Sequence, residues 1–172
     1  WMTISGTLTL TQGKIITGVN RVNIINSAPG ASAPGHATSF VEGNLKRAFA
    51  ATGGSYDFPV GTALKGFQRI NFNFGTANDR MDSQVAFNNA APATPLPFLG
   101  PECISALYDQ SPLNNGYWDV MPTPASGVAP YSVTAYNTGY TNAQTGFTVM
   151  TKYSTGAWGL SGSCVPASPV TA

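Results

Sequence analysis

The chain has 172 residues and a formal net charge of +1, and only 9% of its residues are Asp, Glu, Lys or Arg. An ordinary soluble domain carries about 25% charged residues, so this composition, with its many Gly- and Pro-marked turns, favours an extracellular β-rich module. The eight basic residues are scattered, and only Lys46 and Arg47 are adjacent, which argues against a nucleic-acid partner. No apolar run approaches the ~20 residues of a membrane-spanning helix.

The first 26 residues predict short strands. Over residues 3–11 the threonines occupy one face and Ile4, Leu8 and Leu10 the other. Turn signals then separate strands expected at residues 14–17 and 21–26. This spacing fits either a meander or one edge of a β-helix-like ladder. The opening carries no signal-peptide pattern and begins as if inside a strand, so we expect a processed protein or a piece of a longer one.

The middle of the chain predicts further strands after a loop over residues 27–35 that carries two Pro-Gly turn signals. Residues 39–49 have a helical alternative from Asn44 onward, but the Gly53-Gly54 pair follows closely and a strand is favoured. Strands are also expected at residues 56–61 and 67–74, and the second alternates almost perfectly between apolar and polar residues.

The second half begins with a Pro- and Ala-rich loop or linker over residues 88–101. Strands follow at residues 117–120, 131–136, 147–153 and 157–160, and Trp118 and Trp158 are expected to point inward. The predicted fold is all-β: an antiparallel β-sandwich with short Thr-rich N-terminal strands packed on it. The expected regions are an N-terminal β region (1–87), the loop (88–101) and a C-terminal sandwich region (102–172), which could also form one continuous domain.

The order of these motifs resembles β-sandwich modules in large secreted or surface proteins of the Bacteroidota, of the type exported by type IX secretion. The resemblance covers most of the chain, and Phe58-Pro59-Val60-Gly61 is its most specific element. Asn44 departs from it, because such modules usually have Pro there. The resemblance implies an extracellular or cell-surface location and a structural role. That family has no assigned catalytic residues, so no chemistry is carried over.

The residues themselves offer little catalytic chemistry, and the chain is predicted not to be an enzyme and to use no cofactor. His36 is the only histidine and is expected to be an exposed loop residue, and no Gly-x-Ser-x-Gly elbow is present. Asp109 and Asp119 could form a carboxylate pair, although solvated turns explain them equally well. Residues 78–82 distantly resemble a calcium loop but lack its alternating ligands and its closing Glu.

The two cysteines, Cys103 and Cys164, are expected to form a disulfide, because the composition favours an oxidising compartment. Two buried free thiols are the alternative. The bridge would close a loop of about sixty residues and contribute roughly 4 kcal/mol in the chain-entropy model.

Tyr136 and Tyr140 flank Asn137-Thr138-Gly139, so a hairpin tip could present both to a ligand or partner, with core packing as the alternative. The predicted function is a structural or adhesive module of an extracellular surface assembly or filament, which contacts identical subunits or flanking domains. The alternative is a carbohydrate-binding module of a larger secreted protein, with surface glycans as its ligands.

Overall fold

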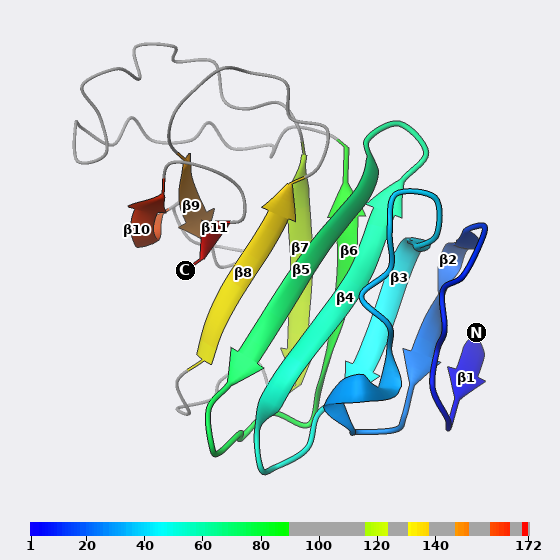
Figure 1. Cartoon of the computed structure of the whole chain (residues 1–172), viewed down its shortest axis with the longest axis horizontal. Helices are drawn as coiled ribbons and strands as arrows, with labels where there is room; N and C mark the ends of the chain where they lie inside the picture. The colour runs from blue at the N-terminus through cyan, green and yellow to red at the C-terminus, as the bar shows by residue number, and fades with distance from the viewer. Residues whose placement is uncertain (90–115, 124–130, 138–146, 152–158, 166–169, 172) are drawn as a thin grey trace.

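The part of the chain that the structure describes consists mostly of β-strands (Figure 1). The computed structural model describes residues 1–89, 116–123, 131–137, 147–151, 159–165 and 170–171, with side chains for 1–89, 116–123 and 131–136. Within these residues the single helical element is a 3-10 turn, η1 (Pro29–Ala31). The predicted all-β class is therefore confirmed.

The strands follow one another in this order: β1 (Met2–Ile4), β2 (Ile15–Ile24), β3 (Val41–Ala48), β4 (Gly54–Thr62), β5 (Gly66–Phe74), β6 (Asp82–Asn88), β7 (Tyr117–Thr123), β8 (Tyr131–Asn137), β9 (Phe147–Thr151), β10 (Gly159–Val165) and β11 (Val170–Thr171).

Nine of these strands form one mixed sheet, which runs β1-β2-β3-β4-β5-β8-β11 with β6 and β7 attached at β3; β9 and β10 form a separate pair. The strands from β1 to β4 pair in parallel, whereas β4, β5, β8 and β11 pair antiparallel. The antiparallel sandwich is thus not confirmed as predicted, because the sheet is mixed. Of the two arrangements left open for the first strands, the parallel ladder is the one observed.

Two predicted boundaries near the N-terminus are wrong. The strand expected over residues 3–11 ends at Ile4, and beyond it Leu8 joins the ladder only through an isolated parallel bridge to Ser32. The two strands expected at residues 14–17 and 21–26 are one strand, β2. Gly18 does not end it, because its positive φ of 56° lets the backbone turn a corner while the pairing with β3 resumes beyond it.

The third strand forks the sheet. Along one edge β3 pairs with β2 on both sides of an irregularity at Gly43, but on the other edge Val41 and Glu42 pair with β4 whereas Leu45 to Ala48 pair with β6. Gly43 lies at the change of partner with φ at 117°. There Thr17 Oγ1 accepts the Asn44 N–H at 3.0 Å, and this side chain occupies the space that a Cβ on residue 43 would need.

The strand β6, which the sequence did not predict, and its partner β7 lie behind β4 and β5 in Figure 1. Trp118 on β7 packs against the core and donates its Nε1–H to the carbonyl of Gln68 on β5 at 3.2 Å. Its ring meets that of Phe87 edge to face, with centroids 5.1 Å apart. The inward orientation predicted for Trp118 is confirmed, whereas Trp158 lies outside the described residues.

Strands from both predicted regions meet in this one sheet. β5 pairs with β8 and β6 pairs with β7, so hydrogen bonds join residues before the Pro- and Ala-rich segment to residues after it. The strand predicted over residues 39–49, for which a helix was the alternative, is confirmed as β3.

The Phe58-Pro59-Val60-Gly61 motif is used in packing. Phe58 and Val60 are fully buried in the core. Pro59 is also buried, and Gly35 packs so closely on it that a Cβ at residue 35 would collide with the proline ring. At Gly61 a Cβ would overlap the Gly66 carbonyl and approach the Phe40 ring to 2.9 Å.

A buried cation lies at the centre of the core. Arg47 is fully buried, and its guanidinium donates to the carbonyls of Asp57 at 2.6 Å and Pro29 at 2.8 Å. Its Cζ lies 5.2 Å from the Tyr56 ring centroid and 5.8 Å from that of Phe58. Burial lowers the pKa of Arg47 to about 10, against the opposing effects of Asp57 and Tyr56. Arg47 therefore stays protonated at neutral pH and fastens the η1 turn to β4.

The change of partner at Gly43 predicts that a single methyl group added there strongly lowers the free energy of unfolding. Gly43→Ala should lower the free energy of unfolding by about 2–4 kcal/mol, because it combines a positive φ with a clash against Thr17. Chemical denaturation measures this difference. Gly6→Ala is the matched control, because a Cβ there meets nothing within 4 Å and it should change stability by less than about 0.5 kcal/mol. Equal effects of the two variants would contradict the role given to Gly43.

Candidate interaction surface

The hydrophobic core is open at the β1 end of the parallel ladder. The column that starts at Met2 continues through Val22 on β2 and Leu45 on β3. Its exposed fraction falls from 45% at Met2 to 1% at Val22 and 0% at Leu45. The neighbouring column shows the same trend, with Ile4 partly buried and Ile24 fully buried. These positions point inward, so the exposure of Met2 and Ile4 reflects a missing cover.

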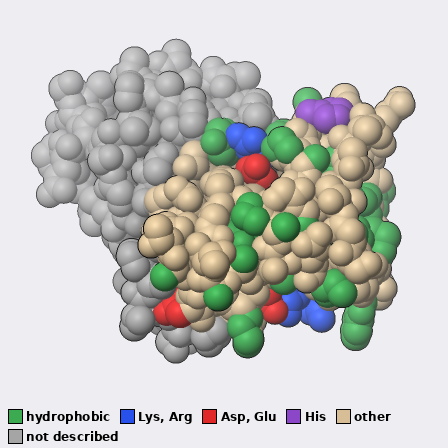
Figure 2. Space-filling view, turned by 60° about the horizontal axis from the view of Figure 1, so that its bottom comes forward, with side chains coloured by type: hydrophobic (Ala, Val, Ile, Leu, Met, Phe, Trp, Pro, Cys, Tyr) green, Lys and Arg blue, Asp and Glu red, His purple; other side chains and the backbone are tan. Residues whose placement is uncertain are grey.

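A hollow of about 300 Å³ lies at this open end, lined in part by Trp1, Met2, Ile15 and Ile16. Among the described residues that line it, Arg21 is the one charged side chain. Ile16 is 73% exposed and Val19 is 98% exposed. In Figure 2 hydrophobic side chains gather at the right-hand edge, which is where β1 and β2 lie in Figure 1. We refer to Trp1, Met2, Ile4, Ile15, Ile16 and Val19 as the open end.

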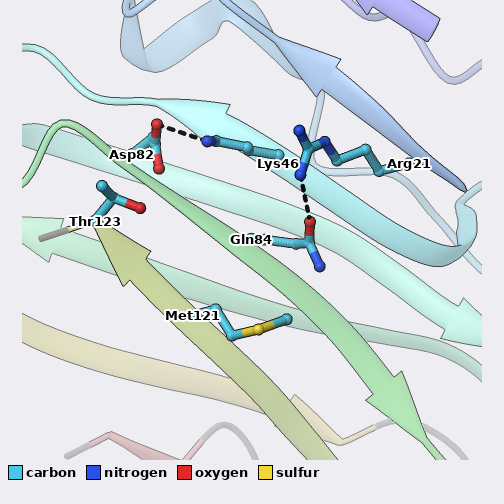
Figure 3. A pocket seen from close by; sticks show the side chains of 6 residues that line it. All are labelled: Arg21, Lys46, Asp82, Gln84, Met121 and Thr123. Carbon is cyan, nitrogen blue, oxygen red and sulfur yellow. Dashed lines mark hydrogen bonds and ion pairs between the residues drawn. The ribbon is translucent and has the colours of Figure 1, made fainter. Parts of the chain in front are cut away.

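A second, polar hollow of about 260 Å³ adjoins the open end on the outer surface of β2, β3, β6 and β7 (Figure 3). It is lined by Arg21, Lys46, Asp82, Gln84, Met121 and Thr123. The register explains why they meet: Lys46 lies opposite Gln84, and Gln84 opposite Met121, on three neighbouring strands. Outward-facing residues at matched positions thus form a row across the sheet.

Charges in this hollow are only partly matched. Lys46 Nζ lies 2.9 Å from Asp82 Oδ2, and Arg21 Nη1 donates to Gln84 Oε1 at 3.4 Å. Arg21 forms no ion pair with a described carboxylate, and its Cζ lies 5.2 Å from the Trp1 ring centroid. Arg21 Nε and Asp82 Oδ1 are buried without a hydrogen-bond partner among the described residues. The hollow therefore offers a guanidinium donor and a neighbouring aromatic ring to an incoming group.

Tyr136 does not present a free ring. It lies on β8 opposite Arg69, whose Cζ is 3.6 Å from the Tyr136 ring centroid. Arg69 Nε lies 3.5 Å from Asp57 Oδ1, which holds the guanidinium in place. One face of the ring is therefore covered by a cation and cannot stack on a sugar. Tyr140 lies outside the described residues, so the predicted tyrosine pair is only half visible.

Of the other predicted site residues, the structure describes the side chains of His36 and Asp119. Cys103, Asp109 and the side chain of Cys164 lie outside the described residues, and their predicted roles stay predictions. His36 is an exposed loop residue, as predicted, and its Nε2 lies 3.2 Å from the carbonyl of Thr11. Asp119 is exposed on β7.

The calcium-like segment forms no converging ligand set. Asn78 closes a local turn, because its Oδ1 accepts the Arg80 N–H at 2.9 Å, and Asp82 pairs with Lys46. Among the described residues no group of three His, Cys, Asp or Glu side chains could hold a metal ion. Within the same part of the chain, no helix is long and apolar enough to cross a membrane.

The sequence did not indicate the open end or Arg21. Ile16 and Val19 sit on either side of Gly18, and apolar residues beside a corner glycine could have suggested exposure. The partner of Arg21 depends on the fork, which brings Gln84 beside it from 63 residues away in the chain.

Comparisons with protein-family models, with curated proteins and with solved structures found no match for this chain. The functional argument therefore rests on the surface itself.

The exposure of Val19 predicts that this residue of the open end is dispensable for folding. Val19→Thr should change the free energy of unfolding by less than about 0.5 kcal/mol, because Val19 is 98% exposed. Val22→Thr is the matched control in the same strand, where Val22 is 1% exposed, and it should cost about 1–3 kcal/mol because it buries an unpaired hydroxyl. Thermal or denaturant unfolding measures both. A large loss with Val19→Thr would show that this residue serves the core.

Proposed function

We propose that this chain is a non-catalytic structural or adhesive module of an extracellular surface assembly, in contact with identical subunits or flanking domains. The observation that carries the proposal is the open end, where Met2 of the inward column and the neighbouring Ile16 and Val19 leave apolar side chains exposed. A contiguous exposed apolar patch of this kind marks an interaction site more often than an accident of folding.

The scarcity of charge supports the same function. Only 9% of the residues are charged, and the net charge is +1, so two copies repel each other little. On the face drawn in Figure 2, Lys, Arg, Asp and Glu side chains are few. Contacts made through such a surface depend on apolar burial, which salt does not screen.

We also propose that the forked sheet forms the two layers of a β-sandwich, with β6 and β7 in one layer and β4, β5 and β8 in the other. The bond from Trp118 Nε1 to the Gln68 carbonyl, which joins β7 to β5, supports this arrangement. Together with the predicted disulfide, such a module suits an extracellular or cell-surface location of the kind that the type IX secretion resemblance implies.

Association of the purified chain tests the structural function. Its average mass by sedimentation or light scattering should rise with protein concentration, and the rise should persist at about 1 M NaCl because apolar contacts are not screened. Val19→Thr together with Ile16→Thr should weaken the association by about tenfold or more, since both side chains belong to the open end. Leu64→Thr, at a 76% exposed residue on the β4–β5 turn, is the control and should leave it unchanged.

A species that stays monomeric at every concentration and also binds no flanking segment would contradict the structural function. If it instead binds a soluble glycan tightly, the second candidate gains.

The second candidate function is carbohydrate binding, and the polar hollow favours it. Arg21 offers a guanidinium without a described carboxylate partner beside the 78% exposed ring of Trp1. A planar guanidinium pairs well with a carboxylate, and an aromatic face stacks on a sugar ring. We therefore expect sugars that carry a carboxylate group to be preferred over neutral ones.

Binding of an acidic oligosaccharide, such as a glucuronate-containing one, tests this candidate. Arg21→Gln should lower its affinity by about tenfold or more, because a charge-assisted hydrogen bond is lost. Arg69→Gln is the matched control at the Tyr136 site, and it should leave the affinity unchanged. Titration calorimetry or a glycan array measures both. Loss of binding in Arg69→Gln alone would move the ligand to Tyr136.

A further inference from the structure

The parallel ladder ends at β1 with its backbone unpaired on one side. Within the described chain β1 has a single neighbour, β2. The Ile4 carbonyl accepts the Ile25 N–H at 3.0 Å, so Ile4 turns its peptide groups toward β2. Alternate residues of a strand bond to opposite sides of the ladder, so the N–H and C=O of Thr3 face away from β2.

The edge of β1 is short, but it carries none of the other features that protect sheet edges. Its three residues, Met2, Thr3 and Ile4, carry no charged side chain, no proline and no bulge. The edge of β7 differs, because it carries Asp119 and Pro122. An edge without charge, proline or bulge, beside a hollow lined in part by apolar side chains, is a template for strand pairing.

We infer that the open end binds a β-strand of a partner polypeptide, which pairs in parallel with β1 through the N–H and C=O of Thr3. The incoming strand has apolar residues at every second position, and these continue the columns of Met2 and Ile4 into the hollow. This inference rests on the proposed structural function and names the kind of partner that the module takes.

Three features set the direction and register. Each existing pair, β1 with β2 and β2 with β3, is parallel, and Met2, Val22 and Leu45 stand in one column. Outside the named strands Leu8 also bridges in parallel with Ser32, because it donates its N–H to Ala31 and accepts from Ala33. A parallel strand on β1 therefore continues the existing stack, as repeat proteins do when one unit covers the next.

The hollow sets the chemistry of the partner. Its volume of about 300 Å³ suits a few apolar side chains, and its lining contains one charged side chain, Arg21. A strand with lysine or aspartate at the inward positions would bury a charge without a partner, which is strongly unfavourable. The partner is therefore an alternating segment whose inward positions carry uncharged, apolar side chains.

A synthetic peptide with the sequence of residues 20–26 is a suitable probe, because the same segment already pairs with the other edge of β1. Added to the isotope-labelled chain, it should slow hydrogen exchange of the Thr3 amide by about tenfold or more and leave the Ile25 amide unchanged. A spin label at the N-terminus of the peptide should broaden signals of Met2 more than those of Ser5, as parallel pairing requires.

Variants distinguish backbone pairing with β1 from non-specific apolar binding. Thr3→Pro removes the outward N–H and should weaken peptide binding by about tenfold or more, while the exposed Thr9→Pro outside β1 leaves it unchanged. Met2→Lys should weaken it similarly through the apolar column. A peptide with lysine in place of Val22 and Ile24 should not bind. The Ile25 amide of each variant, which donates to the Ile4 carbonyl, should stay protected from exchange and reports that β1 is still paired with β2.

The inference is overturned if millimolar peptide leaves the Thr3 amide unprotected, or if Thr3→Pro binds the peptide as well as the original chain. If Thr3→Pro disrupts the ladder itself, two other measurements decide. They are the exchange of the Thr3 amide in the original chain and the peptide affinity of Met2→Lys. Association of the chain that survives in Thr3→Pro would uphold the structural function while rejecting strand pairing, so the two failures are distinguishable.

Discussion

The whole arrangement depends on the change of partner along β3. A straight strand would keep one neighbour on each side, and the chain would then form either a parallel coil or a flat sheet. Because the backbone turns at Gly43, the first part of β3 holds β4 and the second part holds β6. The parallel ladder of β1 to β3 is thereby joined both to β4 and to β6. The polar hollow and the open end both include residues of this ladder.

The buried arginine fixes the same junction from inside. An unpaired charge in a core is costly, and among the described residues no carboxylate lies within ion-pairing distance of Arg47. Backbone carbonyls from two segments and the faces of Tyr56 and Phe58 replace its water. Tyr56 adds to this network, because its hydroxyl accepts the Ala50 N–H at 2.8 Å and lies 3.0 Å from the Ser27 carbonyl. The loops around the core are therefore held by a polar network within it.

The proposed structural function rests on the place where the hydrophobic core ends, at β1. In a parallel ladder each strand adds an apolar residue to the same column, and the next strand covers it. The last strand, β1, has no further neighbour among the described residues, so its apolar residue stays exposed. Met2 and Val22 differ in exposure although they share a column. The fold thus provides a surface that is both apolar and directional. Chemistry at the polar hollow is secondary, because its carboxylate is already paired with Lys46.

The sequence by itself determined the strand content and much of the core. Strict alternation over β5 and the Phe58 motif placed their apolar residues inside, because a period of two admits one orientation once a face is buried. It did not determine pairing direction, the strand β6 or the exposure of Ile16 and Val19. Local alternation is the same in parallel and antiparallel ladders, and the short β6 has only Val85 and Phe87 as large inward apolar residues. The positions of Arg21 and Arg47 were decided by the tertiary structure alone, since their partners come from distant segments that only the fork brings together.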